Sequence, residues 1–306
     1  MDTRNKYAQD GVDVEEGDIF SKFAARLCRE TYGNSPYLEV RDFSSEHFRG
    51  PRGFRLKGLP PDCWLDVTPD GEGTKGVLVD AAGGYDDAAC GWMAMVGGDV
   101  TRWGGIVLAY VNTLDSKTIG KKGDAVNNAF RAMIAGAKRI ADEQAAVLLK
   151  GETAELSSRV VSPNPTALPV WLWSGVAIGA YNPATIITGD NVAEGMLVMA
   201  LRERGFRNNG ISSVIVALEK RFGSNWATNP EATEAVKQAA APAVIYDRFL
   251  ATANGWFDWK FRPEVQAFLV VHVTGGAIKS KLFEDILLPR GLSAELDDLW
   301  EPPNIM

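Results

Sequence analysis

An amphipathic helix that leads directly into a short apolar strand is the feature that most restricts the fold of this chain. The sequence AAVLL at 145–149 predicts a buried strand, and the polar run KGETAE predicts a loop at its carboxyl end. Binding sites often form where strands end, so the carboxylates Glu152 and Glu155 in this loop suit such a site. The helix before the strand is predicted over 125–142 because apolar side chains recur at helical spacing, at Val126, Phe130, Met133, Ile134, Ala137 and Ile140.

Other segments continue this mixture of helices and strands. Two more helices are predicted at 19–31 and 88–100, the second stopping at the glycine pair Gly97–Gly98, and a third at 235–252 with a break at Pro242. The fold class is therefore predicted as α/β (α+β), with two halves joined by the proline-containing linker 162–169. Strands are predicted at 64–67, 170–181, 195–201 and 267–273.

Composition excludes several functional classes. Apolar residues make up 46% of the 306 residues and charged residues 23%, which is typical of globular proteins. A net charge of −7 argues against binding the nucleic-acid backbone. The polar N-terminus is unlike a signal peptide, and the apolar stretch 167–181 is too short to span a membrane. Cys28, Cys63 and Cys90 lack metal-site spacing and predict free thiols in a reducing cytoplasm.

The segment DGEGTK, residues 70–75, is the first with a chemical pattern. Gly71 and Gly73 allow the backbone to turn sharply and to approach a ligand closely. Backbone N–H groups, Thr74 and Lys75 suit phosphate oxygens, and Asp70 suits magnesium. The order of residues is not that of a Walker loop. A plain hairpin turn is the alternative explanation.

Further along the chain, four polar stretches have both a functional and a structural explanation. Asp99 is either a ligand or a surface aspartate, and Glu152 is either a ligand or a helix N-cap. RGFRNNGIS, residues 204–212, is either a ligand-binding or a solvated loop. HVTGGA, residues 272–277, contains either a catalytic or a structural histidine.

Taken in order, these segments resemble the phosphoribosylformylglycinamidine cyclo-ligase (AIR synthase) family. YAQDGVDVEEG at 7–17 resembles the family's opening arm, DGEGTK matches its Asp-Gly-x-Gly-Thr-Lys loop, and GETAE at 151–155 matches Gly-Gly-Glu-Thr-Ala-Glu. RGFRNNGIS resembles Ser-Gly-x-His-Ser-Asn-Gly-x-Ser, and HVTGGA resembles His-x-Thr-Gly-Gly-Gly. The resemblance runs over nearly the whole chain.

The resemblance implies a two-domain fold and a reaction. An arm at 1–18 would precede an ATP-binding and dimerisation domain at 19–162, whose sheet closes a barrel with a second subunit, and a shortened C-terminal α/β domain at 163–306. ATP would phosphorylate the formyl oxygen of formylglycinamidine ribonucleotide. The amidine nitrogen would then attack the activated carbon, and phosphate would leave as the imidazole ring closes.

The resemblance also implies roles for individual residues. Asp70, Asp99 and Glu152 would bind Mg²⁺, and Lys75, Asp99 and Glu152 would be catalytic. ATP would be held by Asp13, Asp70, Gly71, Gly73, Thr74 and Lys75. The substrate would contact Gly205, Arg207, Asn209, Gly210, Thr274 and Gly275.

Several positions depart from the family pattern. Arg207 and Asn208 replace the His-Ser of the substrate loop, and arginine cannot exchange protons near neutral pH as histidine does. Pro69, Gly98 and Lys150 also differ from the family residues, and the chain ends at LWEPPNIM, where relatives continue. Two alternatives therefore stay open: another ATP-dependent kinase or synthetase of the same superfamily, and a non-catalytic nucleotide-binding homologue.

Overall fold

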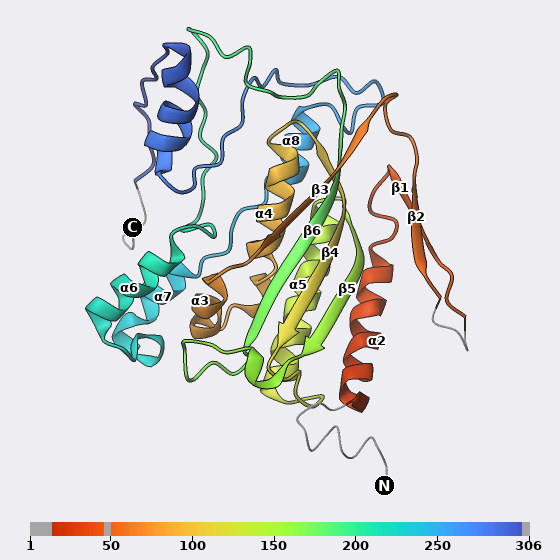
Figure 1. Ribbon diagram of the computed structural model, residues 1–306, viewed down its shortest axis with the longest axis vertical. Helices are drawn as coiled ribbons and strands as arrows, with labels where there is room; N and C mark the ends of the chain where they lie inside the picture. Colours follow the sequence, from red (N-terminus) through yellow and green to blue (C-terminus); the bar gives the residue numbers. More distant parts are fainter. Residues whose placement is uncertain (1–13, 46–49, 302–306) are drawn as a thin grey trace.

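A four-stranded mixed sheet forms the centre of the molecule (Figure 1). The computed structural model describes residues 14–45 and 50–301. The strand order is β3-β6-β4-β5, in which β6 is antiparallel to both of its neighbours and β4 is parallel to β5. The strands in the described residues are β1 (Leu38–Asp42), β2 (Arg52–Leu56), β3 (Trp64–Gly71), β4 (Ile106–Ser116), β5 (Val147–Glu155) and β6 (Trp171–Tyr181).

Helices cover one face of this sheet and flank its β5 edge. Helix α4 packs on β3 and β6, α5 on β5, and α2 lies beside β5 (Figure 1). The largest core cluster lies here and contains Trp92, Tyr110, Phe130 and Trp173. The helices are α2 (Val14–Glu30), α3 (Lys75–Ala82), α4 (Cys90–Thr101), α5 (Ala125–Glu143), α6 (Ile211–Phe222), α7 (Thr233–Ala239) and α8 (Asp247–Ala253), with a π-helix at Lys279–Leu287.

The other face of the sheet is only half covered. Leu38 of the β1–β2 hairpin, together with Trp256, packs against Ala109 and Ala180 in a second core cluster. Leu172 lies on the same face as Ala180, because the two are an even number of residues apart in β6, yet Leu172 is exposed. Part of this face is therefore apolar and open.

The strongest periodic patterns predicted their elements correctly. Helix α5 begins and ends within one residue of the predicted span 125–142, and Asp124 caps it by accepting a hydrogen bond from the Asn127 N–H at 2.8 Å. The predicted helix at 19–31, the strand at 170–181 and the helix broken near Pro242 are also confirmed. The predicted mixed α/β class is confirmed.

Two predicted boundaries are wrong. Helix α4 does not stop at Gly97–Gly98 but continues to Thr101. A Cβ atom at Gly97 would lie 1.8 Å from Oδ2 of Asp247, and one at Gly98 would lie 2.8 Å from Nε2 of His272. These glycines therefore allow close packing and do not end the helix. The predicted loop KGETAE is also wrong, because β5 runs through it to Glu155 and pairs with β4.

Two predicted strands in the C-terminal half are not formed. Residues 195–201 and 267–273 have neither helical nor strand structure, and no strand follows β6 in the described chain. Leu197 is 92% exposed and Met199 is 79% exposed. Apolar composition predicted strands here, but a strand also needs a neighbour to accept its backbone hydrogen bonds.

The predicted domain division at residue 163 would cut through the sheet. β6 begins at Trp171, after that division, yet it lies between β3 and β4. The linker at 162–169 has no regular structure and connects β5 to β6 within the same sheet. We propose a boundary after Tyr181, which leaves the sheet whole.

Candidate active site

Helix α4 is the element against which the glycine-rich loop, the substrate loop and the segment around His272 pack. At its first turn, the side chains of Glu72 and Asn208 both press against Gly91. A Cβ atom there would lie 2.8 Å from Cγ of Glu72 and 3.1 Å from Nδ2 of Asn208. The Asn208 amide also donates a hydrogen bond to the backbone carbonyl of Glu72 at 3.0 Å. The glycine-rich loop and the predicted substrate loop therefore meet at this point.

Glu72 itself is a buried carboxyl group. It is 2% exposed, and neither of its oxygens has a hydrogen-bond partner in the described part of the chain. Burial raises the pKa of Glu72 well above its ordinary value, although the nearby Lys75 charge acts in the opposite direction. Burial therefore favours the neutral, protonated form of Glu72.

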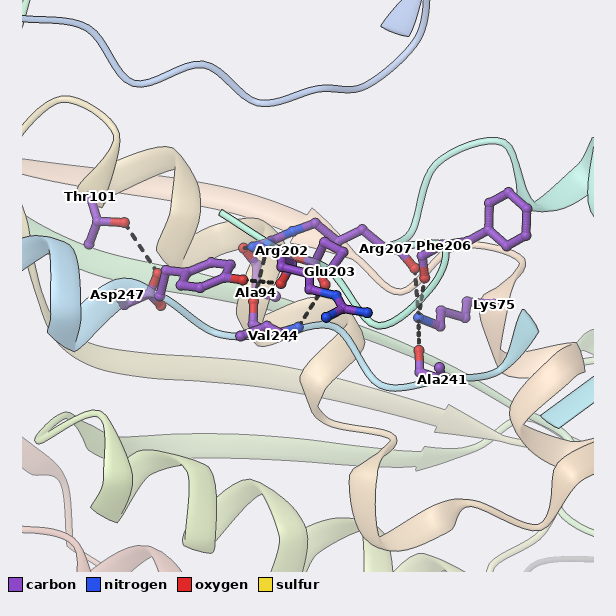
Figure 2. Close-up of polar contacts among 11 residues, drawn as sticks. Lys75, Ala94, Thr101, Arg202, Glu203, Phe206, Arg207, Ala241, Val244 and Asp247 are labelled. Atoms are coloured by element: carbon purple, nitrogen blue, oxygen red, sulfur yellow. Dashed lines mark hydrogen bonds and ion pairs between the residues drawn. The ribbon is translucent and has the colours of Figure 1, made fainter. Parts of the chain in front are cut away.

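Lys75 points inward from the first residue of α3, as Figure 2 shows. Its Nζ donates hydrogen bonds of 2.7 Å to the carbonyl oxygens of Phe206, Arg207 and Ala241. The side chain is 2% exposed, and burial lowers the pKa of the ammonium group to about 8, against the opposing effect of Glu72. The predicted phosphate-binding lysine thus has backbone carbonyls as its partners.

Arg207 is also held by internal contacts (Figure 2). Its Nη1 forms an ion pair with Glu203 and donates to the carbonyl of Val244 at 3.1 Å. Its Nη2 donates to the carbonyl of Ala94 in α4 at 2.9 Å. The guanidinium therefore fixes the substrate loop to α4, and only its Nε lacks a partner among the described residues.

The last turn of α4 brings a histidine and an aspartate together. The Nδ1 of His272 lies 3.6 Å from Oδ1 of Asp99, and Nε of Arg102 lies 3.4 Å from the same oxygen. Burial, and then the positive charges of Arg207 and Arg102, lower the pKa of His272 to about 4. His272 is therefore neutral at pH 7, with Asp99 beside Nδ1.

Asp247 is a second buried carboxyl group next to α4. It accepts hydrogen bonds from the Tyr110 hydroxyl at 3.0 Å and from the Thr101 hydroxyl at 3.2 Å. Burial raises the pKa of Asp247 to about 6, although these hydrogen bonds and the charge of Arg207 lower it. The carboxyl group joins the start of α8 to α4 and β4.

The three predicted magnesium ligands do not converge. Asp70 pairs across the sheet with Gly175, whereas Glu152 pairs with Thr113, which in turn pairs with Ser174. Gly175 and Ser174 are consecutive in β6, so Asp70 and Glu152 lie on opposite faces of the sheet. The three strand spacings between β3 and β5 separate these two residues by about 14 Å.

Asp99 lies apart from both of these carboxylates. The Thr68 hydroxyl of β3 contacts the Val96 carbonyl of α4 at 3.5 Å. From this contact, Asp99 lies one turn further toward the C-terminal end of α4, whereas Asp70 lies two residues along β3 in the opposite direction. Asp99 and Asp70 are therefore on the order of 10 Å apart. Within residues 14–45 and 50–301, no three acidic, histidine or cysteine side chains gather as a metal site requires. The described residues therefore do not bring the three predicted magnesium ligands together, and a shared magnesium site stays a prediction.

The glycine-rich loop retains features that suit an anion. Gly73 has φ of +62°, and Gly73 and Thr74 are exposed immediately before α3. Thr74 forms no side-chain hydrogen bond that caps this helix. The side chain of Thr74 therefore does not compete for the first backbone N–H groups of α3, where the helix dipole attracts negative charge. The Gly71 N–H, by contrast, already donates to Asp70 at 2.6 Å.

The remaining predicted residues are divided between two loops. Gly205 is buried, and Asn209 and Gly210 are exposed where the substrate loop enters α6. Thr274 and Gly275 follow His272, beside the last turn of α4. Asp13 lies outside the described residues.

Sequence reasoning missed several buried polar groups. Glu72 occupies the variable position of DGEGTK, and Glu203, which holds Arg207, lies just before the substrate loop. Asp247 interrupts the apolar run AVIYDRFL, which is a usable signal for a buried acid. Tyr110 offers no such signal, because its partner Asp247 is 137 residues away.

Two surface hollows lie away from this cluster. One, of about 450 Å³, is lined by Asp66, Trp103, Tyr181 and Ile187 among others. A second, of about 250 Å³, lies between Tyr85 and the first turns of α5. Neither hollow is lined by a predicted site residue.

Comparison with curated proteins gives a consistent set of relatives. The phosphoribosylformylglycinamidine cyclo-ligase of Thermodesulfovibrio yellowstonii is 26% identical over 304 residues, covering 98% of this chain and 80% of that protein. The chain is a distant relative of these cyclo-ligases. The Oceanobacillus iheyensis cyclo-ligase is 26% identical over 98% of the chain, and that of Sorangium cellulosum is 28% identical over 95%. No family model matches the chain.

Solved structures show more distant similarities to this chain. Thiamine-monophosphate kinase from Stenotrophomonas maltophilia superimposes with a TM-score of 0.46 at 14% identity, covering 74% of this chain and 63% of the kinase. Hydrogenase maturation protein HypE in complex with ATP gives a TM-score of 0.29 at 15% identity, covering 46% of this chain and 36% of HypE.

Among the described helices, none combines the length and apolar character needed to cross a membrane.

Proposed function

We propose that this protein is an ATP-dependent ligase of the cytoplasm that converts formylglycinamidine ribonucleotide to aminoimidazole ribonucleotide in purine synthesis. The observation that carries the proposal is 26–28% identity to curated cyclo-ligases over 95–98% of the chain. The motifs GETAE and DGEGTK occur in the family's order along the same span.

The reaction has a clear physical requirement. An amide oxygen is a poor leaving group until it is phosphorylated, and phosphoryl transfer depends on positioning and on neutralisation of charge. ATP would transfer its γ-phosphoryl group to the formyl oxygen, and the amidine nitrogen would then attack that carbon. The C–O bond breaks as phosphate leaves, and the imidazole ring closes with loss of the nitrogen's proton.

We assign the ATP phosphates to the exposed backbone at Gly73 and Thr74 and to the start of α3. Support comes from the positive φ of Gly73 and from the uncapped helix N-terminus. Asp70 remains a proposed ATP-binding residue, and Glu152, on the opposite face of the sheet, remains a proposed catalytic residue. We include Mg²⁺ as the counter-ion of ATP and assign no step to a metal held jointly by Asp70, Asp99 and Glu152.

For the second substrate we propose the surface formed by the 205–210 loop and the 272–275 segment. Arg207 and His272 both approach Gly98 from these two segments, since a Cβ atom there would lie 3.5 Å from Nη2 of Arg207 and 2.8 Å from Nε2 of His272. Arg207 would act by fixing the loop, because its Nη atoms are already bonded within the protein. Asn209 and Gly210 are the exposed end of that loop.

The test is incubation of the protein with ATP, Mg²⁺ and formylglycinamidine ribonucleotide, followed by detection of aminoimidazole ribonucleotide. Glu152→Gln should reduce turnover at least tenfold while circular dichroism stays unchanged. Glu219→Gln, an exposed substitution on α6, is the matched control and should retain full turnover. Full turnover in Glu152→Gln would remove Glu152 from the site.

Another ATP-dependent kinase or synthetase reaction is the alternative, favoured by the internal bonding of Arg207 at the position of the family's histidine. Phosphate release that requires a different small substrate, and is indifferent to formylglycinamidine ribonucleotide, would establish it. ATP binding without any phosphate release would indicate a non-catalytic homologue.

A further inference from the structure

The ammonium group of Lys75 has every proton committed to the protein backbone. Its three hydrogen bonds, each 2.7 Å, end on the carbonyl oxygens of Phe206, Arg207 and Ala241 (Figure 2). A lysine ammonium has three donors and no acceptor, so this arrangement leaves no proton for a phosphate oxygen. The side chain is also 2% exposed, which keeps an anion from reaching it.

These bonds connect parts of the chain that are distant in sequence. Lys75 begins α3, directly after the glycine-rich loop, whereas its acceptors lie 131 to 166 residues later. A further hydrogen bond, from Asn208 to the Glu72 carbonyl at 3.0 Å, joins the same two loops. The substrate loop is thus anchored to the glycine-rich loop by carbonyls at 206 and 207 and by the side chain at 208.

The packing around the anchor is tight. Glu72 and Asn208 meet at Gly91, where a Cβ atom would lie 2.8 Å from the glutamate side chain. Glu72 lies beside Lys75, and both side chains are 2% exposed. A buried charge is costly unless it is fully hydrogen-bonded, and charge-assisted bonds to three carbonyls meet that need. The geometry is that of an internal brace.

We propose that Lys75 is a positioning residue, which fixes the 205–210 loop against the glycine-rich loop and thereby sets the binding surface of the second substrate, rather than a ligand of the ATP phosphates. This inference rests on the proposed function for the identity of that substrate. The bracing itself does not depend on it. Loss of the brace releases the loop that ends in Asn209 and Gly210, while the exposed backbone of Gly73 and Thr74 stays in place.

The experiment compares Lys75→Met and Lys75→Arg with wild type. Amide hydrogen exchange at residues 205–212 reports the loop, and calorimetry with a non-hydrolysable ATP analogue reports the nucleotide. Lys75→Met removes all donors. Lys75→Arg keeps the charge but presents a planar fork that cannot reach three carbonyls around one point. Lys22→Met, an exposed substitution on α2, is the matched control.

The brace predicts faster exchange of the loop, by at least tenfold, in both Lys75 variants, with the Kd of the nucleotide within threefold of wild type. The KM for formylglycinamidine ribonucleotide should rise at least tenfold. A phosphate ligand predicts the reverse: unchanged loop exchange and at least a tenfold rise in the nucleotide Kd for Lys75→Met. That result, or no change in either measurement, overturns the proposal.

Asn208→Ala resolves a result in which both measurements change in the Lys75 variants. It loosens the same loop without touching the lysine. If Asn208→Ala also weakens the nucleotide, the effect passes through the loop and the brace stands. If it loosens the loop alone, Lys75 contacts the nucleotide and the proposal fails. Exchange needs no turnover, so absence of cyclisation refutes the proposed function and leaves this test intact.

Discussion

Buried ionisable side chains shape the chemistry of this protein at the scale of the residue. Lys75, Glu72 and Asp247 are each 2% exposed, and each lies against or near α4. Their environments differ. The Lys75 ammonium group donates three hydrogen bonds, and each oxygen of Asp247 accepts one. Neither carboxyl oxygen of Glu72 has a hydrogen-bond partner in the described chain. Burial therefore favours the neutral form most strongly for Glu72.

Asp247 gives a prediction about pH and stability. Its folded pKa of about 6 lies above the ordinary value of 3.8, so its contribution to stability is present below pH 4 and is lost as pH rises through 6. Asn is neutral at every pH and can still accept from Tyr110. The free energy of unfolding of Asp247→Asn, minus that of wild type, should rise by about 2 kcal/mol between pH 4 and pH 7.

Urea denaturation of both proteins at pH 4, 5, 6 and 7 measures this difference. Other titrating groups, such as His272, are common to both proteins and cancel. A difference that stays constant over this range would show that Asp247 titrates at its ordinary pKa.

At the scale of the element, α4 is distinguished by its glycines. Gly91, Gly97 and Gly98 let Glu72, Asp247 and His272 approach the helix backbone. Glycine weakens a helix interior by about 1 kcal/mol relative to alanine, so this helix gives up intrinsic stability for close contact. The same pair of glycines misled the prediction of where α4 ends.

Gly97→Ala tests the close packing of α4. The new Cβ would lie 1.8 Å from Oδ2 of Asp247, which forces the start of α8 away from α4. The overpacking should lower the free energy of unfolding by about 1–3 kcal/mol. Gly17→Ala in α2 is the control, because nothing lies within 4 Å of its Cβ, and it should stabilise the protein by about 0.5–1 kcal/mol. Chemical denaturation measures both, and a stabilised Gly97→Ala would contradict the packing.

At the scale of the whole molecule, the sheet has an open apolar face. Leu65, Val67 and Leu172 lie on one side of the β3–β6 pair, since Val67 pairs with Ile178 and Leu65 with Ala180. All three are at least half exposed. An exposed apolar sheet face favours association, and we propose a second copy of this chain as its partner, in line with the predicted homodimer.

Val67→Lys should weaken this association. Val67 is 62% exposed, so a lysine there should leave the fold of the single chain intact while placing a charge in the interface. Wild type should sediment at twice the 33.2 kDa chain mass and Val67→Lys at the mass of one chain. Val216→Lys on α6, also exposed, is the control and should remain a dimer. A wild type that stays monomeric at tens of micromolar would refute the dimer.

Local sequence patterns determined the elements whose own residues form a continuous apolar face. Helix α5 was predicted correctly from the helical spacing of residues such as Phe130, and strand β6 from its continuous apolar run. The order of short motifs likewise indicated the relationship to the cyclo-ligases, because each motif lies within a few consecutive residues and is legible without its partners in space.

Tertiary structure alone decided the rest. Whether 195–201 forms a strand depends on a pairing partner, and whether Asp70, Asp99 and Glu152 share an ion depends on which strands and helix carry them. The motif around Lys75 predicts a phosphate ligand. In the structure its ammonium group instead donates to three carbonyls that are more than 130 residues away. Contacts at such separations leave no periodic trace in the sequence, because each depends on how two distant segments pack together.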